Sequence, residues 1–215
     1  MLPLTLAIPI AAAASATLHI RAEYRGPRWQ VYLFKPLTTT LLLLLASLAP
    51  GIQPPGYRLA IVIGLACSLI GDILLMLPRD RFVAGLASFL LAHLAYILAF
   101  STGVPATRGP LLALPLLAAA AVLLRLLWPG LGKLRLPVLL YTLTILVMVW
   151  RAWARNQALP SSSAMLAAAG ATLFMISDAL LALNRFYRPF RLAQALIMIT
   201  YVGAQTLIAL SVSRA

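Results

Sequence analysis

The chain has 215 residues, of which 63% are hydrophobic and only 10% are charged. Soluble domains average about 45–50% apolar and about 25% charged residues, so this composition excludes a soluble globular protein. The 17 Lys and Arg residues against four Asp and Glu residues give a net charge of +13, but the basic residues form short clusters between long apolar runs. This placement indicates an integral membrane protein with basic loops and argues against a nucleic-acid partner.

The apolar runs predict an all-α membrane domain that occupies the whole chain, residues 1–215. A hydrocarbon core about 30 Å thick requires about 20 apolar residues per helix, and the runs are continuous rather than alternating, which disfavours a β-barrel. Cutting the chain at polar and Pro- or Gly-containing breaks predicts a bundle of eight membrane-spanning helices and no soluble domain. The predicted spans are residues 2–20, 30–49, 57–77, 82–101, 110–128, 134–154, 162–183 and 190–211.

The loops between these spans differ in charge. The odd-numbered connections contain eleven of the 17 basic residues, and the positive-inside rule therefore places them in the cytoplasm and both termini outside. We expect a multi-pass protein of the cell membrane, that is, the inner or plasma membrane. His19 is expected at the membrane interface, and Glu23 and Asp80 are expected to pair with loop arginines. The eleven residues are Arg21, Arg25, Arg28, Arg79, Arg81, Arg125, Lys133, Arg135, Arg185, Arg188 and Arg191.

Spans three and seven end in similar sequences, SLIGDILLMLPRDRF and FMISDALLALNRFYRPF. In each, an Asp lies six residues before a Pro or Asn that is followed by Arg. Because both spans are expected to cross the membrane in the same direction, the similarity leaves open an arrangement of two parallel four-helix repeats.

Ionisable residues within the spans are the candidates for function, because each costs a few kcal/mol in the membrane and usually faces the bundle interior. Lys35, Asp72 and Asp178 each lie five or six residues from a predicted cytoplasmic end, which places them at one level about 8–9 Å below the boundary. We predict Asp72 and Asp178 as catalytic residues, while the alternative is that these groups only hold helices together. The predicted substrate-binding or supporting residues are Lys35 and Tyr141 at this level and His93, Tyr96, Tyr201 and Gln205 deeper.

Two carboxyl groups in a low-dielectric pocket need not both be charged, so one can act as an acid and the other as a base. That pair suits hydrolysis of an acid-labile bond. Lys35 would keep one carboxylate ionised or contact a phosphate. The chain has no serine-hydrolase elbow, zinc-protease motif or P-loop, and its single Cys67 lies in an apolar run, so we predict no metal and no cofactor.

Five stretches together form a further pattern. They are FKPLTT (34–39), SLIGDILLML (68–77), F-x-x-G-L-x-x-F-x-x-A-H-x-x-Y (82–96), GATLFMISDALLAL (170–183) and Y-x-x-A-Q (201–205). In this combination the chain resembles the YhhN family of polytopic membrane proteins. The resemblance implies an eight-helix lysoplasmalogenase that cleaves the vinyl-ether bond of a lysoplasmalogen to a fatty aldehyde and a glycerophospho-alcohol. It also implies that the family's acidic, lysine and histidine positions are Asp72, Asp178, Lys35 and His93.

The mechanism implied by this resemblance follows the two-carboxylate logic of glycoside hydrolysis. One Asp would protonate the enol ether, and the other would orient water and stabilise the cation. The phosphate of the lysophospholipid or ether lipid could be held by Arg79, Arg81 and Arg185. Two other functions stay open: a small proton-coupled transporter of lipid or solute, and a non-catalytic lipid-binding protein.

Overall fold

The computed structural model describes residues 4–50, 53–105, 109, 111 and 113–213, and this part of the chain is all-helical. Two short 3₁₀ turns, Trp128–Gly130 and Gly132–Leu134, connect α5 to α6, and a π-helical turn, η4 (Leu183–Tyr187), continues α7. The α-helices are α1 (Leu4–Arg25), α2 (Arg28–Leu48), α3 (Pro55–Met76), α4 (Phe82–Ser101), α5 (Ala113–Leu127), α6 (Arg135–Ala158), α7 (Ser162–Ala182) and α8 (Ala193–Leu210).

The predicted architecture of an all-α, membrane-spanning bundle is confirmed. In the described part of the chain, seven helical segments are long and apolar enough to cross a membrane: α2, α3, α4, α6, α7, α8, and α5 together with the turn that follows it, Ala113–Gly130; α1 has 22 residues. Helix α1 continues to Arg25, five residues beyond the predicted end of the first span, and only Gly26 and Pro27 separate it from α2. Proline lacks a backbone donor, so this pair, rather than the arginines before it, ends the helix. Parts of the predicted starts at residues 2 and 110 lie outside the described residues.

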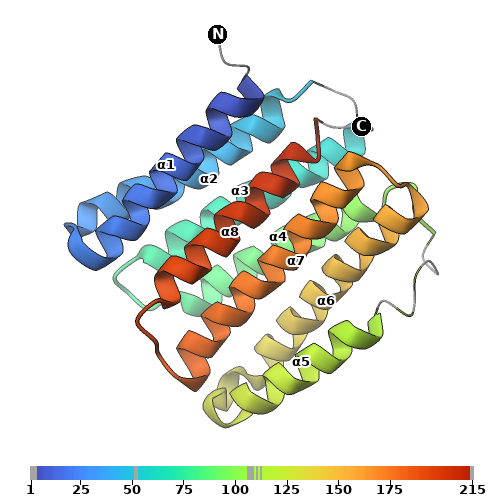
Figure 1. The fold of residues 1–215 in the computed structure, drawn as a ribbon. Coiled ribbons are helices and arrows are strands. Elements are labelled where there is room, and N and C mark those ends of the chain that lie inside the picture. Colours follow the sequence, from blue (N-terminus) through green and yellow to red (C-terminus); the bar gives the residue numbers. More distant parts are fainter. Residues whose placement is uncertain (1–3, 51–52, 106–108, 110, 112, 214–215) are drawn as a thin grey trace.

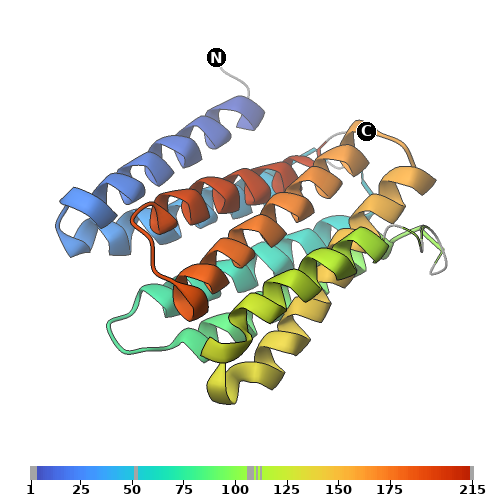
Figure 2. The same ribbon diagram turned by 60° about the horizontal axis from the view of Figure 1, so that its bottom comes forward.

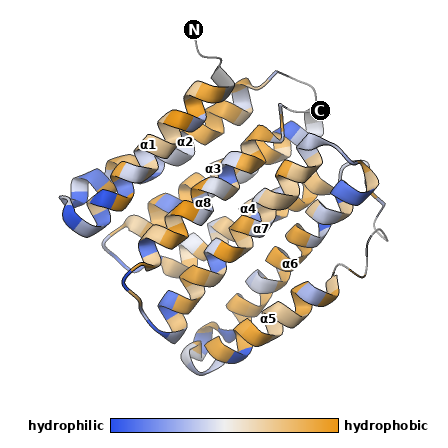
Figure 3. Cartoon of the chain, viewed as in Figure 1, coloured by the Kyte–Doolittle hydropathy of each residue, from blue (hydrophilic) through white to orange (hydrophobic). Residues whose placement is uncertain are grey.

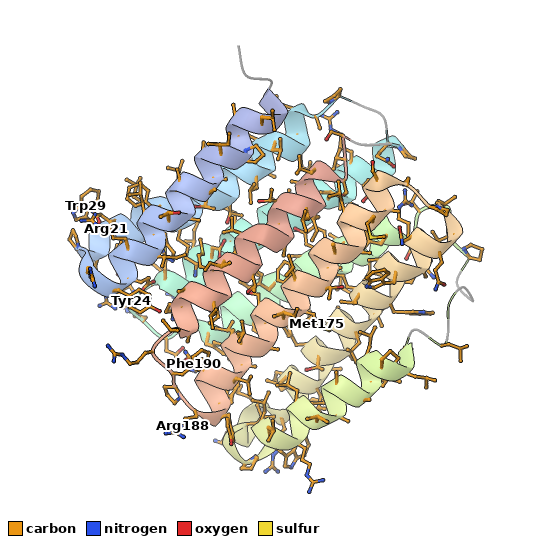
Figure 4. All side chains as sticks on the ribbon, in the orientation of Figure 1. Arg21, Tyr24, Trp29, Met175, Arg188 and Phe190 are labelled. Carbon is orange, nitrogen blue, oxygen red and sulfur yellow. The ribbon has the colours of Figure 1, made fainter. Side chains whose placement is uncertain are left out.

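The connections sort to the two ends of the bundle (Figures 1 and 2). We call one end the basic end: it carries the α1–α2, α3–α4, α5–α6 and α7–α8 connections, and α3 and α7 both run toward it. Hydrophobic residues dominate the middle of the helices, and hydrophilic residues gather toward the ends (Figure 3). Figure 4 shows Arg21 and Arg188 at the basic end. The positive-inside rule predicts that this end faces the cytoplasm.

Helix packing repeats between the two halves of the chain. In the first half α1 packs on α2, α2 on α3 and α3 on α4, and in the second half α5 packs on α6, α6 on α7 and α7 on α8. Between the halves, α4 packs on α6, and its counterpart α8 packs on α2. One pairing is unmatched, because α1 packs on α8 whereas α5 makes no comparable contact with α4 in the described residues. The packing is therefore that of two parallel four-helix repeats with one gap.

Glycines on α3 bring α4 close to it. A Cβ at Gly64 would collide with Cε1 of Tyr96, and a Cβ at Gly71 would lie 2.7 Å from Cε2 of Phe89. Small residues allow helices to approach closely in membrane proteins. Here they allow the two aromatic rings of α4 to lie directly against the α3 backbone, toward the bundle interior.

Candidate active site

Asp72 on α3 is almost fully buried, with 2% of its surface exposed. Its Oδ2 accepts hydrogen bonds from Thr39 Oγ1 of α2 at 2.6 Å and from Tyr201 Oη of α8 at 2.7 Å. Its Oδ1 lies 3.7 Å from Lys35 Nζ. Because Lys35 and Thr39 are four residues apart, they share one face of α2. Asp72 therefore has one cationic neighbour and two neutral donors.

The carboxyl group of Asp178 on α7 lies next to a tyrosine hydroxyl and a histidine ring. Tyr141 Oη of α6 donates to Asp178 Oδ2 at 2.8 Å, and Nε2 of His93 from α4 lies 3.5 Å from the same oxygen. Among the described residues, no Lys or Arg nitrogen pairs with this carboxyl. The fully buried His93 ring packs edge-on against Tyr141 and Phe174, with centroid distances of 5.2 and 4.7 Å. Neither of its nitrogens has a hydrogen-bond partner in the described part of the chain.

The two carboxyl groups occupy equivalent places in the two halves. Each Asp lies on the third helix of its half and contacts the second helix of the same half and the fourth helix of the other half. The partners differ in charge, because α2 supplies Lys35 where α6 supplies Tyr141. The repeated framework therefore holds two chemically unlike carboxyl groups.

Aromatic rings fill the space between the two groups. Phe174 contacts the rings of His93 and Tyr201, at centroid distances of 4.7 and 5.5 Å. Behind them, Tyr96 Oη donates to Gln205 Oε1 at 2.7 Å, and both side chains are completely buried. Tyr96 and Gln205 join α4 to α8 beneath the candidate site and do not line its cavities.

A polar cavity of about 410 Å³, which we call the vestibule, lies at the basic end and is lined by both Asp72 and Asp178. Lys35 and Tyr201 also line it. The polar residues at its mouth are Arg79, Asp80, Arg81, Asn184, Arg185 and Gln194.

A second cavity of about 200 Å³, which we call the slot, lies among α4, α5, α6 and α7 and is almost entirely apolar. Asp178 and Tyr141 are its main polar lining groups. Phe82, Leu181 and Asp178 line both the slot and the vestibule. The Asp178 carboxyl therefore lies where the polar and apolar cavities meet, whereas Asp72 lines the vestibule but not the slot.

Sequence comparison relates this chain to a family of known proteins. The model of the YhhN family matches residues 30–212. The chain belongs to the YhhN family. It is 38% identical over 199 residues to the Escherichia coli O157:H7 protein named uncharacterized membrane protein YhhN, covering 93% of this chain and 95% of the relative.

Animal relatives of this YhhN-family protein carry an enzyme name. Lysoplasmalogenase TMEM86B of Sus scrofa is 37% identical over 190 residues, which cover 87% of this chain and 77% of the relative. Lysoplasmalogenase TMEM86A of Homo sapiens is 36% identical over 197 residues, which cover 86% and 79%. No solved structure matches the chain.

Helix α1 contributes His19 to the vestibule of this YhhN-family protein. His19, which is predicted at the membrane interface, is 3% exposed, lines the vestibule and has its Nε2 3.7 Å from Glu23 Oε1. It is buried within the bundle because α1 continues for six residues beyond it. Asp80 pairs with a loop arginine as expected, accepting from Arg185 at 2.6 Å. This hydrogen bond holds the pKa of the exposed Asp80 carboxyl below its ordinary value.

Sequence reasoning missed Thr39 as a partner of Asp72. The available signal was its position one turn after Lys35, on the same helix face. Nor did the sequence reveal that Arg151 and Arg155, toward the opposite end of the bundle, are buried, at 5% and 6% exposure. Arg151 donates to the Val104 carbonyl at 2.8 Å, so these arginines satisfy carbonyls where α4 ends.

Proposed function

We propose that this protein is a membrane-embedded hydrolase that cleaves the vinyl-ether bond of a lysoplasmalogen or related lysolipid by acid and base catalysis at Asp178 and Asp72. The observation that carries the proposal is that two carboxyl groups in equivalent positions line one cavity but differ in their neighbours. The names of the animal relatives support the substrate class.

The neighbours of each Asp support different roles for the two carboxyl groups. Lys35 and the two donors to Asp72 Oδ2 stabilise a carboxylate. Asp178 has a tyrosine donor and no cation, and an uncompensated charge in a low-dielectric site is costly. Asp178 is therefore the proton donor, and Asp72 is the base. His93 and Tyr141 position the donor through their contacts with its Oδ2.

The reaction consumes one water and restores both groups. The Asp178 carboxyl gives its proton to the second carbon of the alkenyl chain, and the double-bond electrons form the new C–H bond. Water adds to the first carbon of the resulting oxocarbenium ion and passes a proton to Asp72, which forms a hemiacetal. The bond from that carbon to the glycerol oxygen then breaks, the oxygen takes the proton from Asp72, and the hemiacetal hydroxyl returns a proton to Asp178 as the aldehyde forms.

The test is aldehyde release from a lysoplasmalogen by the purified protein in liposomes. Asp178→Asn and Asp72→Asn should each lower the rate by about 10²–10⁴-fold, the usual contribution of a positioned acid or base. The control is Thr206→Val, which removes an intramembrane hydroxyl of α8 that, among the described residues, donates to the Val202 carbonyl of its own helix. Release that survives both Asp substitutions would refute the mechanism. Proton-gradient-driven uptake without aldehyde would instead support a transporter.

A further inference from the structure

The slot exists because the second half of the chain lacks one contact of the first. In the first half α1 closes against α8, whereas its counterpart α5 stands away from α4. Among the described residues of α5, only Ala120 and Leu127 are buried. Leu127 packs with Leu131 and Val138 at the basic end, so α5 is held there, and its middle borders the opening.

The lining of the slot is suited to hydrocarbon. Leu86 of α4, Leu123 of α5 and Ile145 of α6 face it, together with Met175, which Figure 4 shows near the middle of α7 and far from Arg188 at the basic end. Outward-facing residues of α5, such as Leu117 and Val122, are 51% and 63% exposed, as expected of a lipid-facing helix. The gap between α4 and α5 therefore borders the hydrocarbon of the bilayer.

We propose that the slot is the binding site for the single hydrocarbon chain of the substrate, which passes between α4 and α5 into the bilayer while the phosphate head group occupies the vestibule. This inference rests on the proposed function. A lysolipid is polar on one side of its ether oxygen and apolar on the other. The vestibule is likewise polar, the slot is apolar, and the two cavities meet at Asp178.

The placement also accounts for the choice of proton donor. The carbon that is protonated is the second carbon of the chain, on the apolar side of the ether oxygen. Asp178 lines the slot, and Asp72 does not. With the chain in the slot, Asp178 is thus the carboxyl on the side of the carbon that receives the proton, and Asp72 faces the polar side.

A binding measurement tests the slot without relying on turnover. The probe is a saturated 1-O-alkyl lysophosphoethanolamine with a 16-carbon chain, which has no vinyl ether to cleave, compared with chain-free glycerophosphoethanolamine. Ala120→Phe fills the slot, and Ala121→Phe adds the same ring on the exposed side of the same helix. We expect Ala120→Phe to weaken binding of the alkyl probe at least tenfold, to leave binding of the chain-free compound unchanged, and Ala121→Phe to alter neither.

Ala120→Leu, paired with Ala121→Leu, provides a smaller change if the phenylalanine variant does not fold, and it should give an intermediate loss. Equal binding by the Ala120 and Ala121 variants would overturn the slot assignment. Wild-type protein that binds the alkyl probe through the slot but releases no aldehyde from lysoplasmalogen would overturn the hydrolase and leave the slot standing. Aldehyde release that is unaffected by Ala120→Phe would overturn the slot assignment and leave the hydrolase standing.

Discussion

The Lys35–Asp72 pair can be separated into a structural and a catalytic contribution by a double-mutant cycle. Lys35→Met removes the ammonium group and leaves the Asp72 carboxylate with Thr39 and Tyr201 as donors. Breaking a buried ion pair from one side costs about 3–5 kcal/mol. The Lys35 side chain is 18% exposed and its nitrogen lies 3.7 Å from the carboxylate, so we expect a loss at or just below the lower limit of that range, about 2–3 kcal/mol.

Asp72→Asn should cost less. Its amide oxygen can still accept from Thr39 or Tyr201, and Lys35 can extend its ammonium group toward the vestibule. We expect a loss of about 1–2 kcal/mol. The double variant contains neither charge, so its loss should be smaller than the sum of the single losses by about 1–2 kcal/mol.

The assay is reversible unfolding in mixed detergent micelles, with aldehyde release measured on the same preparations. The double variant should be about as stable as Lys35→Met, rather than less stable, and should be inactive because the Asp72 carboxylate is missing. Strictly additive losses, within about 0.5 kcal/mol, would show that the two groups do not interact. An active double variant would remove Asp72 from the mechanism.

Three further changes test other parts of the structure. Gly64→Ala should cost about 1–3 kcal/mol in detergent unfolding because its Cβ would meet the buried Tyr96 ring, whereas Gly56→Ala, with no atom within 4 Å, should cost nothing. An equal effect at both glycines would refute close packing of α3 on α4. Arg151→Met should lower stability by about 1–3 kcal/mol with unchanged KM, since it leaves a buried carbonyl unpaired; a KM effect would contradict a purely structural role. Arg81→Gln should raise KM several-fold and weaken its salt dependence, whereas an unchanged KM would exclude a phosphate contact.

The helices were predictable because length and apolarity are properties of consecutive residues. Counting residues from the predicted helix ends also placed Lys35, Asp72 and Asp178 at one level of the membrane, and the structure brings the first two into contact. Depth alone did not identify which of the two carboxyl groups pairs with Lys35, since both were expected at the same depth. That choice depends on which helices pack together, and α2 packs on α3 rather than on α7.

Side chains with local alternatives were harder to predict. A threonine such as Thr39 can bond to its own helix backbone, as Thr144 and Thr206 do, so its type and position do not reveal a contact across helices. The burial of Arg151 depends on carbonyls of the segment that follows α4, which lie 46 and 47 residues away in the sequence. The burial of His19 depends on where α1 ends, which a single Gly-Pro pair decides.

The two halves repeat in helix packing but differ at the places that matter for an unsymmetrical substrate. A symmetric pair of carboxyl groups would offer no reason for one to carry the proton and the other the charge. Asp178 has the neutral Tyr141 where Asp72 has Lys35, so the surroundings of Asp178 carry no cation. The open gap between α4 and α5 makes the same surroundings apolar. Both departures from symmetry thus fall around one Asp, which is the arrangement required if the protonated carbon belongs to the hydrocarbon chain and the phosphate lies on the other side.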